Sequence, residues 1–288
     1  MPGSWPSGRR SRRHCRHSPC RHSDKEPNPM SATVHYERRG KLALIQLDRP
    51  DTSNAIDPPT LQALGAAYHR ADKHDAIVAV VLHAAGPDFS VGLDPKSFLP
   101  TLQNRTFSTD GPGQINPFGT TTRLSKPLVI AVQGNVGAMA HELMLAADIR
   151  IAASDARFSQ SEPSRGTTPA AGGGIRMPLE VGWANAMRWI LTGETWDAEE
   201  ALRLGLVQEV VAPGNQLPRA IALADKIAAN PPLALRETLK LGRRAWEGHA
   251  HQVYADLLPA LYQLLATEDF AERLTALREG RTPVYTGR

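Results

Sequence analysis

The segment GNVGAMAHELMLAADIRIAASDARFSQSEPSRGTTPAAGGGIR, residues 134–176, holds two glutamates in unlike local settings. Glu142 lies in the apolar run HELMLAAD, which predicts a helix beginning near Ala138. Glu162 lies in a polar turn, directly after the short strand-like piece ARFSQ. The glycines at 172–174 predict a bend that leads back into apolar sequence. The segment therefore predicts that separate elements carry the two carboxylates.

Two carboxylates that come together from separate elements suit acid–base chemistry at adjacent carbons. The same residues also have an ordinary explanation. Glu142 favours the N-terminal end of a helix, and Glu162 is then a solvated loop residue. From these residues alone both explanations stand.

The sequence around this segment alternates between strand and helix patterns. VHYERR and LALIQL predict a hairpin that turns at Gly40. Asp57, followed by two prolines, predicts the start of a helix. Continuous apolar runs at 76–84 and 127–134 predict buried strands, and a short helix is expected near Lys96. This alternation predicts the α/β class.

After Gly182 the pattern becomes mostly helical. Asp197 and Glu200 resemble a capping box. An apolar stripe from Val253 to Leu264 predicts a helix that Pro259 should kink. Thr267 is expected to cap a last helix, which ends at Gly280. The stripe is either core or an oligomer contact.

Residues 1–30 differ from the rest in composition. They hold seven basic and two acidic residues, a net charge of +5, so the rest of the chain has a net charge of −1 and is near neutral. Few apolar residues occur there, which predicts a disordered basic tail or a misassigned start, with Met30 as the alternative first residue. Contact with nucleic acid through the tail is the weaker alternative.

Both cysteines, Cys15 and Cys20, lie in this tail beside three histidines, but their spacing fits no common zinc pattern. We expect no metal site. A cysteine-free remainder suits the cytoplasm. The chain has no apolar run near the roughly 18 residues of a membrane span and no signal-peptide core. These features predict a soluble, cytoplasmic protein.

Several well-known motifs are missing from the sequence, namely GxGxxG, the Walker loop, HExxH and GxSxG. What remains, besides the glutamates, is two bends at 91–93 and 138–140. The first follows a buried strand and the second opens a helix, whose free N–H groups favour anions. If the bends face each other, they would bind a developing enolate oxygen.

Motifs along most of the chain resemble the crotonase (enoyl-CoA hydratase/isomerase) superfamily. LDRPDTSNA at 47–55 resembles the opening LxRPxxxNA of that family, and FSVGLD at 89–94 is similar to its F-[SA]-x-G-x-D. Further blocks follow in family order between residues 33 and 280. They are KPLVIAVQG, HELMLAADIRIA, FSQSEPSRGTTPAAGGGIRM, LTGETWDAEEALRLGLVQEVV and TEDFAERLTAL.

The resemblance implies a fold of the α/β class, a crotonase-like spiral of ββα units over residues 31–228. Residues 229–288 would form a helical C-terminal region that serves oligomerisation. Members of the family are usually homotrimers, often paired into hexamers. The implied ligand is an acyl-CoA thioester, with no cofactor other than coenzyme A as part of the substrate.

The resemblance also implies roles for individual residues. The amides of Leu93 and Met139 would hold the thioester oxygen. Glu142 would act as the base that activates water, and Glu162 would supply the proton to Cα. Coenzyme A would lie along a set of residues from the two preceding motifs. They are Ser53, Ala55, Val91, Asp94, Pro95 and Lys96.

The expected activity is hydration of a 2-enoyl-CoA. The alternatives are double-bond isomerisation, another enolate reaction of the superfamily, or a catalytically silent binding or scaffold protein of this fold. The chain departs from the family pattern at Ala138-Met139-Ala140, where the family has three glycines. His141 should point about 100° away from Glu142 and is interpreted as structural. Arg165 is either a surface residue or selects an acidic acyl group.

Overall fold

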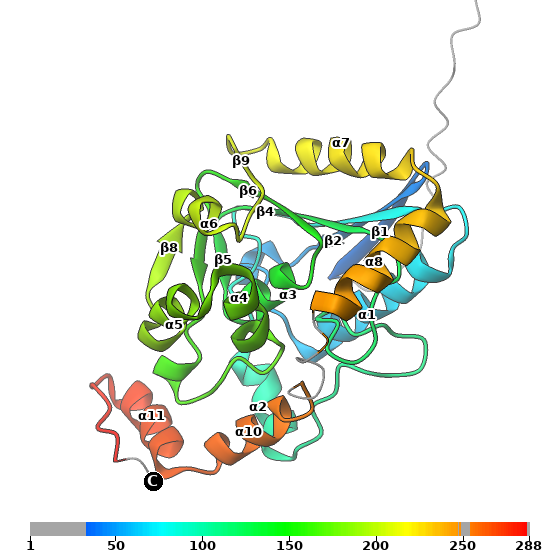
Figure 1. The fold of residues 1–288 in the computed structure, drawn as a ribbon. Coiled ribbons are helices and arrows are strands. Elements are labelled where there is room, and N and C mark those ends of the chain that lie inside the picture. The colour runs from blue at the N-terminus through cyan, green and yellow to red at the C-terminus, as the bar shows by residue number, and fades with distance from the viewer. Residues whose placement is uncertain (1–32, 247, 249–253, 287–288) are drawn as a thin grey trace, which may run out of the picture.

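A computed structural model describes residues 33–288 except 247, 249–253, 287 and 288. The predictions for residues 1–30, including the cysteine–histidine group, lie outside the described residues. The structure is of the α/β class, as the strand and helix patterns predict, and Figure 1 shows a central sheet with helices on both faces.

The main sheet has six strands in the order β1-β2-β3-β4-β6-β9. The predicted hairpin is confirmed, because β1 pairs antiparallel with β2 and the turn contains Gly40 at φ +60°. All further neighbours are parallel. β3 begins three residues later than the apolar run that predicted it. The strands are β1 (Val34–Arg39), β2 (Leu42–Leu47), β3 (Ala79–Ala84), β4 (Leu128–Val132), β6 (Ile149–Ala153) and β9 (Glu209–Val211).

Helices cover both faces of this sheet. Leu42 and Leu44 of β2 belong to the apolar cluster that contains Ala220 and Ala224 of α7 (Gln216–Ala228). The alternate residues of β2 pack in a second cluster with α1 (Pro58–Lys73). Asp57 caps α1 as predicted, since its carboxylate accepts a hydrogen bond from the amide of Thr60. Successive side chains of a strand point to opposite faces of the sheet, so β2 packs against α7 on one face and α1 on the other.

A smaller sheet stands beside the first and carries the segment that contains the glutamates. β5 (Asn135–Gly137) pairs parallel with β7 (Arg157–Ser159), and β7 pairs antiparallel with β8 (Thr195–Asp197). The helix α3 (Met139–Leu145) follows β5 after one residue. In Figure 1, the helices α4 to α6 lie around this sheet. They are α4 (Gly173–Val181), α5 (Trp183–Thr192) and α6 (Ala198–Leu204).

The carboxylate of Asp197 caps α6, and Gly205 ends it, as predicted. The capping box itself does not form, because the carboxylate of Glu200 binds Arg203 instead of the amide of Asp197.

The C-terminal part is helical, as expected. Figure 1 shows α10 and α11 at the end of the molecule where α2 lies, and α10 contacts α2. Thr267 caps α11 and Gly280 ends it, as predicted. The division of the chain at residue 228 into a core and a C-terminal region stays a prediction. The remaining helices are α2 (Pro95–Gln103), α8 (Pro232–Trp246), α10 (Leu257–Leu265) and α11 (Glu268–Glu279).

The kink predicted at Pro259 is wrong. α10 begins at Leu257, so Pro259 lies in the first turn of the helix. Residues of the first turn have no intrahelical acceptor for their N–H groups, and a proline there removes no hydrogen bond.

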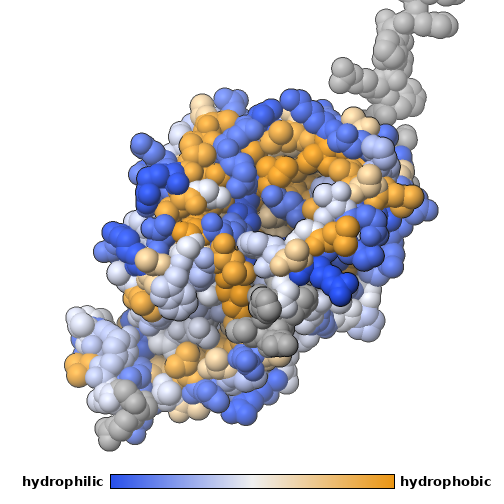
Figure 2. Space-filling model, in the orientation of Figure 1, coloured by the Kyte–Doolittle hydropathy of each residue, from blue (hydrophilic) through white to orange (hydrophobic). Residues whose placement is uncertain are grey.

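Apolar surface gathers in a hollow between α7 and α8, which Figure 2 shows in orange. Leu233 and Leu241 of α8 are largely exposed, and Leu217 and Ile221 of α7 are only partly buried. Among the helices of the described residues, none is both long and apolar enough to cross a membrane.

Candidate active site

The helix α3 holds Glu142 inside the molecule. All seven of its residues are buried, and the residue before it, Ala138, has φ +49° and ψ −121°. This backbone conformation favours glycine, so Ala138 stores strain at the start of the helix. At the other end, the buried guanidinium of Arg150 donates hydrogen bonds to the carbonyls of Met144, Leu145 and Ala147. Arg150 thereby satisfies the carbonyls that a helix end leaves open.

Glu142 is buried, with 2% of the residue exposed. Its Oε1 atom accepts hydrogen bonds from the amides of Ala171 at 2.9 Å and Gly173 at 2.8 Å. Burial, followed by repulsion from Glu162, raises the pKa of Glu142 to about 8, although the two amides and Arg176 act in the opposite direction. Glu142 and Glu162 therefore share a proton at neutral pH, which a carboxylate at a helix surface would not hold.

Glu162 lies directly before the short 3-10 helix η2 (Pro163–Arg165) and is half-buried. Both of its carboxylate oxygens accept hydrogen bonds from the amide nitrogen of Gln160, at 2.9 Å each. Burial raises the pKa of Glu162 against the lowering effects of Gln160 and Arg165. The interpretation of Glu162 as a solvated loop residue is wrong, because its carboxyl faces a cavity that Glu142 also lines.

His141 contacts the same network. Its Nδ1 atom lies 2.6 Å from Oε1 of Gln160, and both side chains are fully buried. The amide nitrogen of Gln160 faces Glu162, so Oε1 of Gln160 faces His141 and needs a donor there. Nδ1 of His141 therefore carries the proton. Burial lowers the pKa of His141 to about 4, which keeps the ring neutral.

The glycines at 172–174 do more than form the predicted bend, because α4 begins within them. Gly172 has φ +105°. A Cβ atom on Gly173 would stand 2.9 Å from Cγ of Glu142 and 2.9 Å from Oε1 of Gln160. Only a glycine lets this backbone pass between the two side chains and place its amide on Glu142.

The two bends predicted to bind an oxyanion lie against each other. Gly92 has φ +93°, and a Cβ atom there would come within 3.2 Å of the amide nitrogen of Met139 and 2.6 Å of the carbonyl oxygen of Gly137. Within the described part of the chain, the amides of Leu93 and Met139 donate to no acceptor. Two free N–H groups thus lie on neighbouring bends, as an oxyanion site requires.

These groups line one cavity of about 250 Å³. Leu93, Met139, Glu142 and Glu162 all lie in its wall, together with apolar residues of α2, α10 and α11. A cavity with an apolar wall and a few convergent polar groups is the usual form of a small-molecule site.

The six residues expected along coenzyme A lie close to one another, but only Pro95 lines the cavity itself. The backbone holds the segments together, since the amide of Val91 donates to the carbonyl of Ser53. Asp94 caps α2 by accepting from the amide of Lys96, and its bond from Ser97 helps to lower its pKa. Ala55 accepts a hydrogen bond from Arg49 through its carbonyl. Val91 and Lys96 are exposed.

Sequence reasoning missed two residues of the site. Gln160 orients Glu162, and a polar residue two positions before a candidate glutamate was the available signal. Arg176 is fully buried and donates to the carbonyls of Phe118 at 2.6 Å and Gly119 at 3.2 Å. The available signal for Arg176 was a charged residue within the apolar run that follows the glycines.

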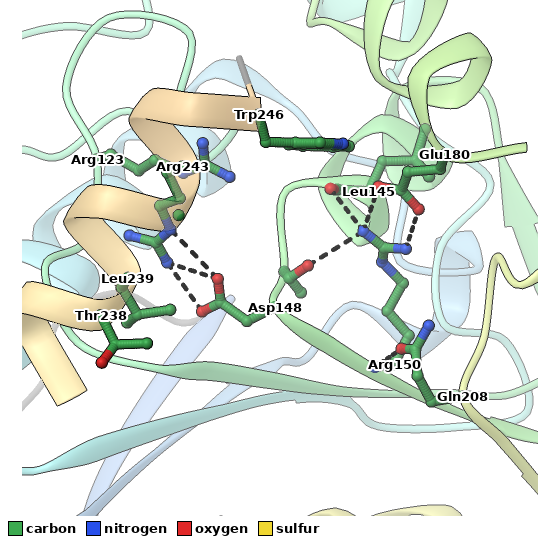
Figure 3. A pocket seen from close by; sticks show the side chains of 12 residues that line it. Arg123, Leu145, Asp148, Arg150, Glu180, Gln208, Thr238, Leu239, Arg243 and Trp246 are labelled. Atoms are coloured by element: carbon green, nitrogen blue, oxygen red, sulfur yellow. Dashed lines mark hydrogen bonds and ion pairs between the residues drawn. The ribbon is translucent and has the colours of Figure 1, made fainter. Parts of the chain in front are cut away.

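A second pocket, of about 400 Å³, lies between α8 and the end of α3. Figure 3 shows Arg243 facing Asp148 and Arg150 facing Glu180 across it. These charged groups satisfy one another, and neither candidate glutamate lines this pocket. The pairs join α8 and α4 to the core. Among the described residues, no group of three or more histidine, cysteine or acidic side chains is placed to hold a metal ion.

Comparison with known proteins agrees with this geometry. The sequence pattern of the enoyl-CoA hydratase/isomerase family matches residues 37–288. The chain is 32% identical to the short-chain-enoyl-CoA hydratase of Clostridium acetobutylicum, over 86% of this chain and 95% of that protein.

Two crystal structures are similar over 89% of this chain and 99% of theirs. One is a probable enoyl-CoA hydratase/isomerase from Mycobacterium abscessus, with 39% identity and a TM-score of 0.73. The other is a carnitinyl-CoA hydratase from Mycobacterium avium, with 32% identity and a TM-score of 0.79. With this coverage in sequence and in structure, the chain belongs to the crotonase, or enoyl-CoA hydratase/isomerase, superfamily.

Proposed function

We propose that the protein is a hydratase that adds water across the double bond of a 2-enoyl-CoA. The observation that carries this proposal is the pairing of Glu142 and Glu162 in one apolar cavity, where each carboxyl has a raised pKa. The hydratase names of similar proteins support it.

The reaction follows from the positions of the groups. The thioester oxygen accepts hydrogen bonds from the amides of Leu93 and Met139. Glu142 takes a proton from water, and the oxygen of that water forms a bond to Cβ. The electron pair of the double bond moves onto the thioester as an enolate, which the two amides stabilise by typically about 2.7–4 kcal/mol each. Glu162 then donates a proton to Cα, so that the elements of water are added overall.

The two carboxyls need opposite protonation states, and their surroundings support this. Burial raises both pKa values, and repulsion from Glu162 adds to the rise at Glu142, so the pair retains a proton at neutral pH. Oε1 of Glu142 accepts two backbone N–H bonds, a setting that favours the charged form. The negative charge therefore rests on Glu142, the base, and the proton rests on Glu162, the acid.

Further parts of the proposal concern binding and assembly. Coenzyme A would lie along Ser53, Ala55, Val91 and the turn at 94–96, and no other cofactor takes part. The apolar hollow between α7 and α8 supports assembly into homotrimers, or hexamers of two trimers. A cytoplasmic location belongs to the same proposal.

The test is to incubate the protein with crotonyl-CoA and follow the loss of the conjugated thioester absorbance. Glu142→Gln and Glu162→Gln should each lower turnover by at least about a hundredfold. Glu194→Gln, an exposed glutamate outside the cavity, is the matched control.

Turnover close to that of the unchanged protein in Glu162→Gln would remove Glu162 from the mechanism. Coenzyme A binding without hydration in the unchanged protein would favour isomerisation of a different double bond. Neither binding nor hydration would favour a silent scaffold protein.

A further inference from the structure

Two arginines line the cavity that contains the glutamates. Arg165 is the last residue of η2, three positions after Glu162, and Arg273 lies on α11. The two elements are neighbours, because a Cβ atom on Gly166 would stand 3.6 Å from the ring of Phe270. The hydroxyl of Tyr285 also reaches the carbonyl of Ser164 at 3.5 Å. The arginines therefore belong to the same side of the cavity.

Neither guanidinium forms a hydrogen bond or an ion pair with another side chain or backbone group among the described residues. Directly after α11 the opposite is seen, since Arg281 pairs with Glu272 and Glu279 of that helix. The wall around the arginines is apolar apart from the two glutamates and two threonines.

The charges in the cavity do not balance. The arginines contribute two positive charges, whereas the raised pKa values of the glutamates leave the pair with a proton at neutral pH. Arg165 is exposed and Arg273 is half-buried, and both line this cavity. The fork of donors on each guanidinium fits a carboxylate.

We infer that the preferred substrate is an acyl-CoA whose acyl chain ends in a carboxylate, held by Arg165 and Arg273. This inference rests on the proposed function, because it places the acyl group in this cavity. The anion is either that carboxylate or a phosphate of coenzyme A. The proposed role of Glu162 is at Cα, so Arg165 lies on the acyl side, whereas the expected coenzyme A contacts come from 53–55 and 91–96.

The size and the charge of the cavity narrow the substrate further. A volume of about 250 Å³ is below the 300–1,000 Å³ typical of whole-ligand sites and suits a short acyl chain. A carnitinyl group carries a quaternary ammonium, which two guanidinium groups repel. The chain therefore differs in acyl selectivity from the carnitinyl-CoA hydratase that it resembles in fold.

The test compares two unreactive ligands of equal length, hexanoyl-CoA and adipoyl-CoA, which end in a methyl and a carboxylate group. Calorimetric titration of the full chain should show at least tenfold tighter binding of adipoyl-CoA. Arg165→Gln and Arg273→Gln should each lower that ratio at least threefold, and Arg273→Lys should retain part of it. Arg278→Gln is the matched control, because Arg278 lies on α11 outside the cavity wall.

Equal affinity for the two ligands would overturn the inference. The inference would also be overturned if the arginine variants lost the same factor of affinity for both ligands and for free coenzyme A. In that case the arginines would bind a phosphate of coenzyme A. Rates with trans-2-hexenoyl-CoA and trans-2-hexenedioyl-CoA separate this inference from the proposed function. If adipoyl-CoA binds more tightly but neither enoyl-CoA is hydrated, the proposed hydration is refuted and the carboxylate site is not. If both enoyl-CoA substrates are hydrated with equal efficiency and adipoyl-CoA has no advantage in binding, the carboxylate site is refuted and hydration is not.

Discussion

The contact between His141 and Gln160 makes His141→Phe an informative substitution. The phenyl ring keeps the flat shape that packs edge-on against Trp196, at 5.2 Å between ring centres, but it has no donor for Oε1 of Gln160. We expect the amide of Gln160 to lose its fixed orientation and Glu162 to lose the donor that serves both of its oxygens. His141 is a positioning residue in this scheme, since it acts on Glu162 through Gln160.

The size of the effect follows from burial. Gln160 is fully buried, and a buried acceptor without a partner costs about 1–3 kcal/mol. If that cost falls on the transition state, kcat/KM drops by about 5- to 150-fold. The bond from Gln160 lowers the pKa of Glu162, so its loss raises that pKa further. Since Glu162 is proposed to act in its protonated form, the alkaline limb of the pH–rate profile should move to higher pH.

The assay is the pH dependence of kcat/KM with crotonyl-CoA for three variants. His141→Asn should recover much of the rate, because the amide nitrogen of asparagine can take the place of Nδ1. His83→Phe, on β3 outside the cavity, is the matched control for replacing a largely buried neutral histidine. An unshifted profile in His141→Phe, or an asparagine variant as slow as the phenylalanine variant, would refute the reasoning.

Three further substitutions probe stability. Glu142→Gln should stabilise the fold increasingly between pH 5 and 8. The pKa of Glu142 is raised from 4.5 to about 8 in the native state, so the free energy of unfolding of the unchanged protein falls as pH rises through this range. A gain in thermal stability that does not grow with pH would contradict this. Ala138→Gly should raise the free energy of unfolding by about 1 kcal/mol, since glycine relieves the positive φ, and urea titration would show a loss if the strain is absent. Arg243→Met should cost about 3 kcal/mol in the same titration, because Asp148 is left as a largely buried charge without its partner; a change below about 0.5 kcal/mol would show that the pair is not stabilising.

The local elements could be predicted because their signals are local. The turn at Gly40, the caps at Asp57 and Thr267 and the helix ends at Gly205 and Gly280 each depend on a few neighbouring residues. The failure at Pro259 has the same origin. Its effect depends on where the helix begins, which the apolar stripe placed too early.

The contacts within the site could not be predicted in the same way. Gly173 lies between Glu142 and Gln160 only because elements distant in sequence meet there. No pattern of residue spacing predicts this contact. The sequence offered the two glutamates and the resemblance to a family gave their roles, but neither gave the orientation of Gln160 by His141. Both belong to tertiary packing, which local propensity does not encode.

The walls contributed by α10 and α11 have a consequence for how the protein is made. A ribosome synthesises the chain from its N-terminus, so both glutamates and both oxyanion bends leave it before α11 does. Until then the cavity lacks part of its wall, because Leu261, Phe270 and Leu274 have not yet been synthesised. A nascent or C-terminally truncated chain would therefore hold its acid and base in a groove without these walls. Catalytic competence would begin only with the final segment of translation.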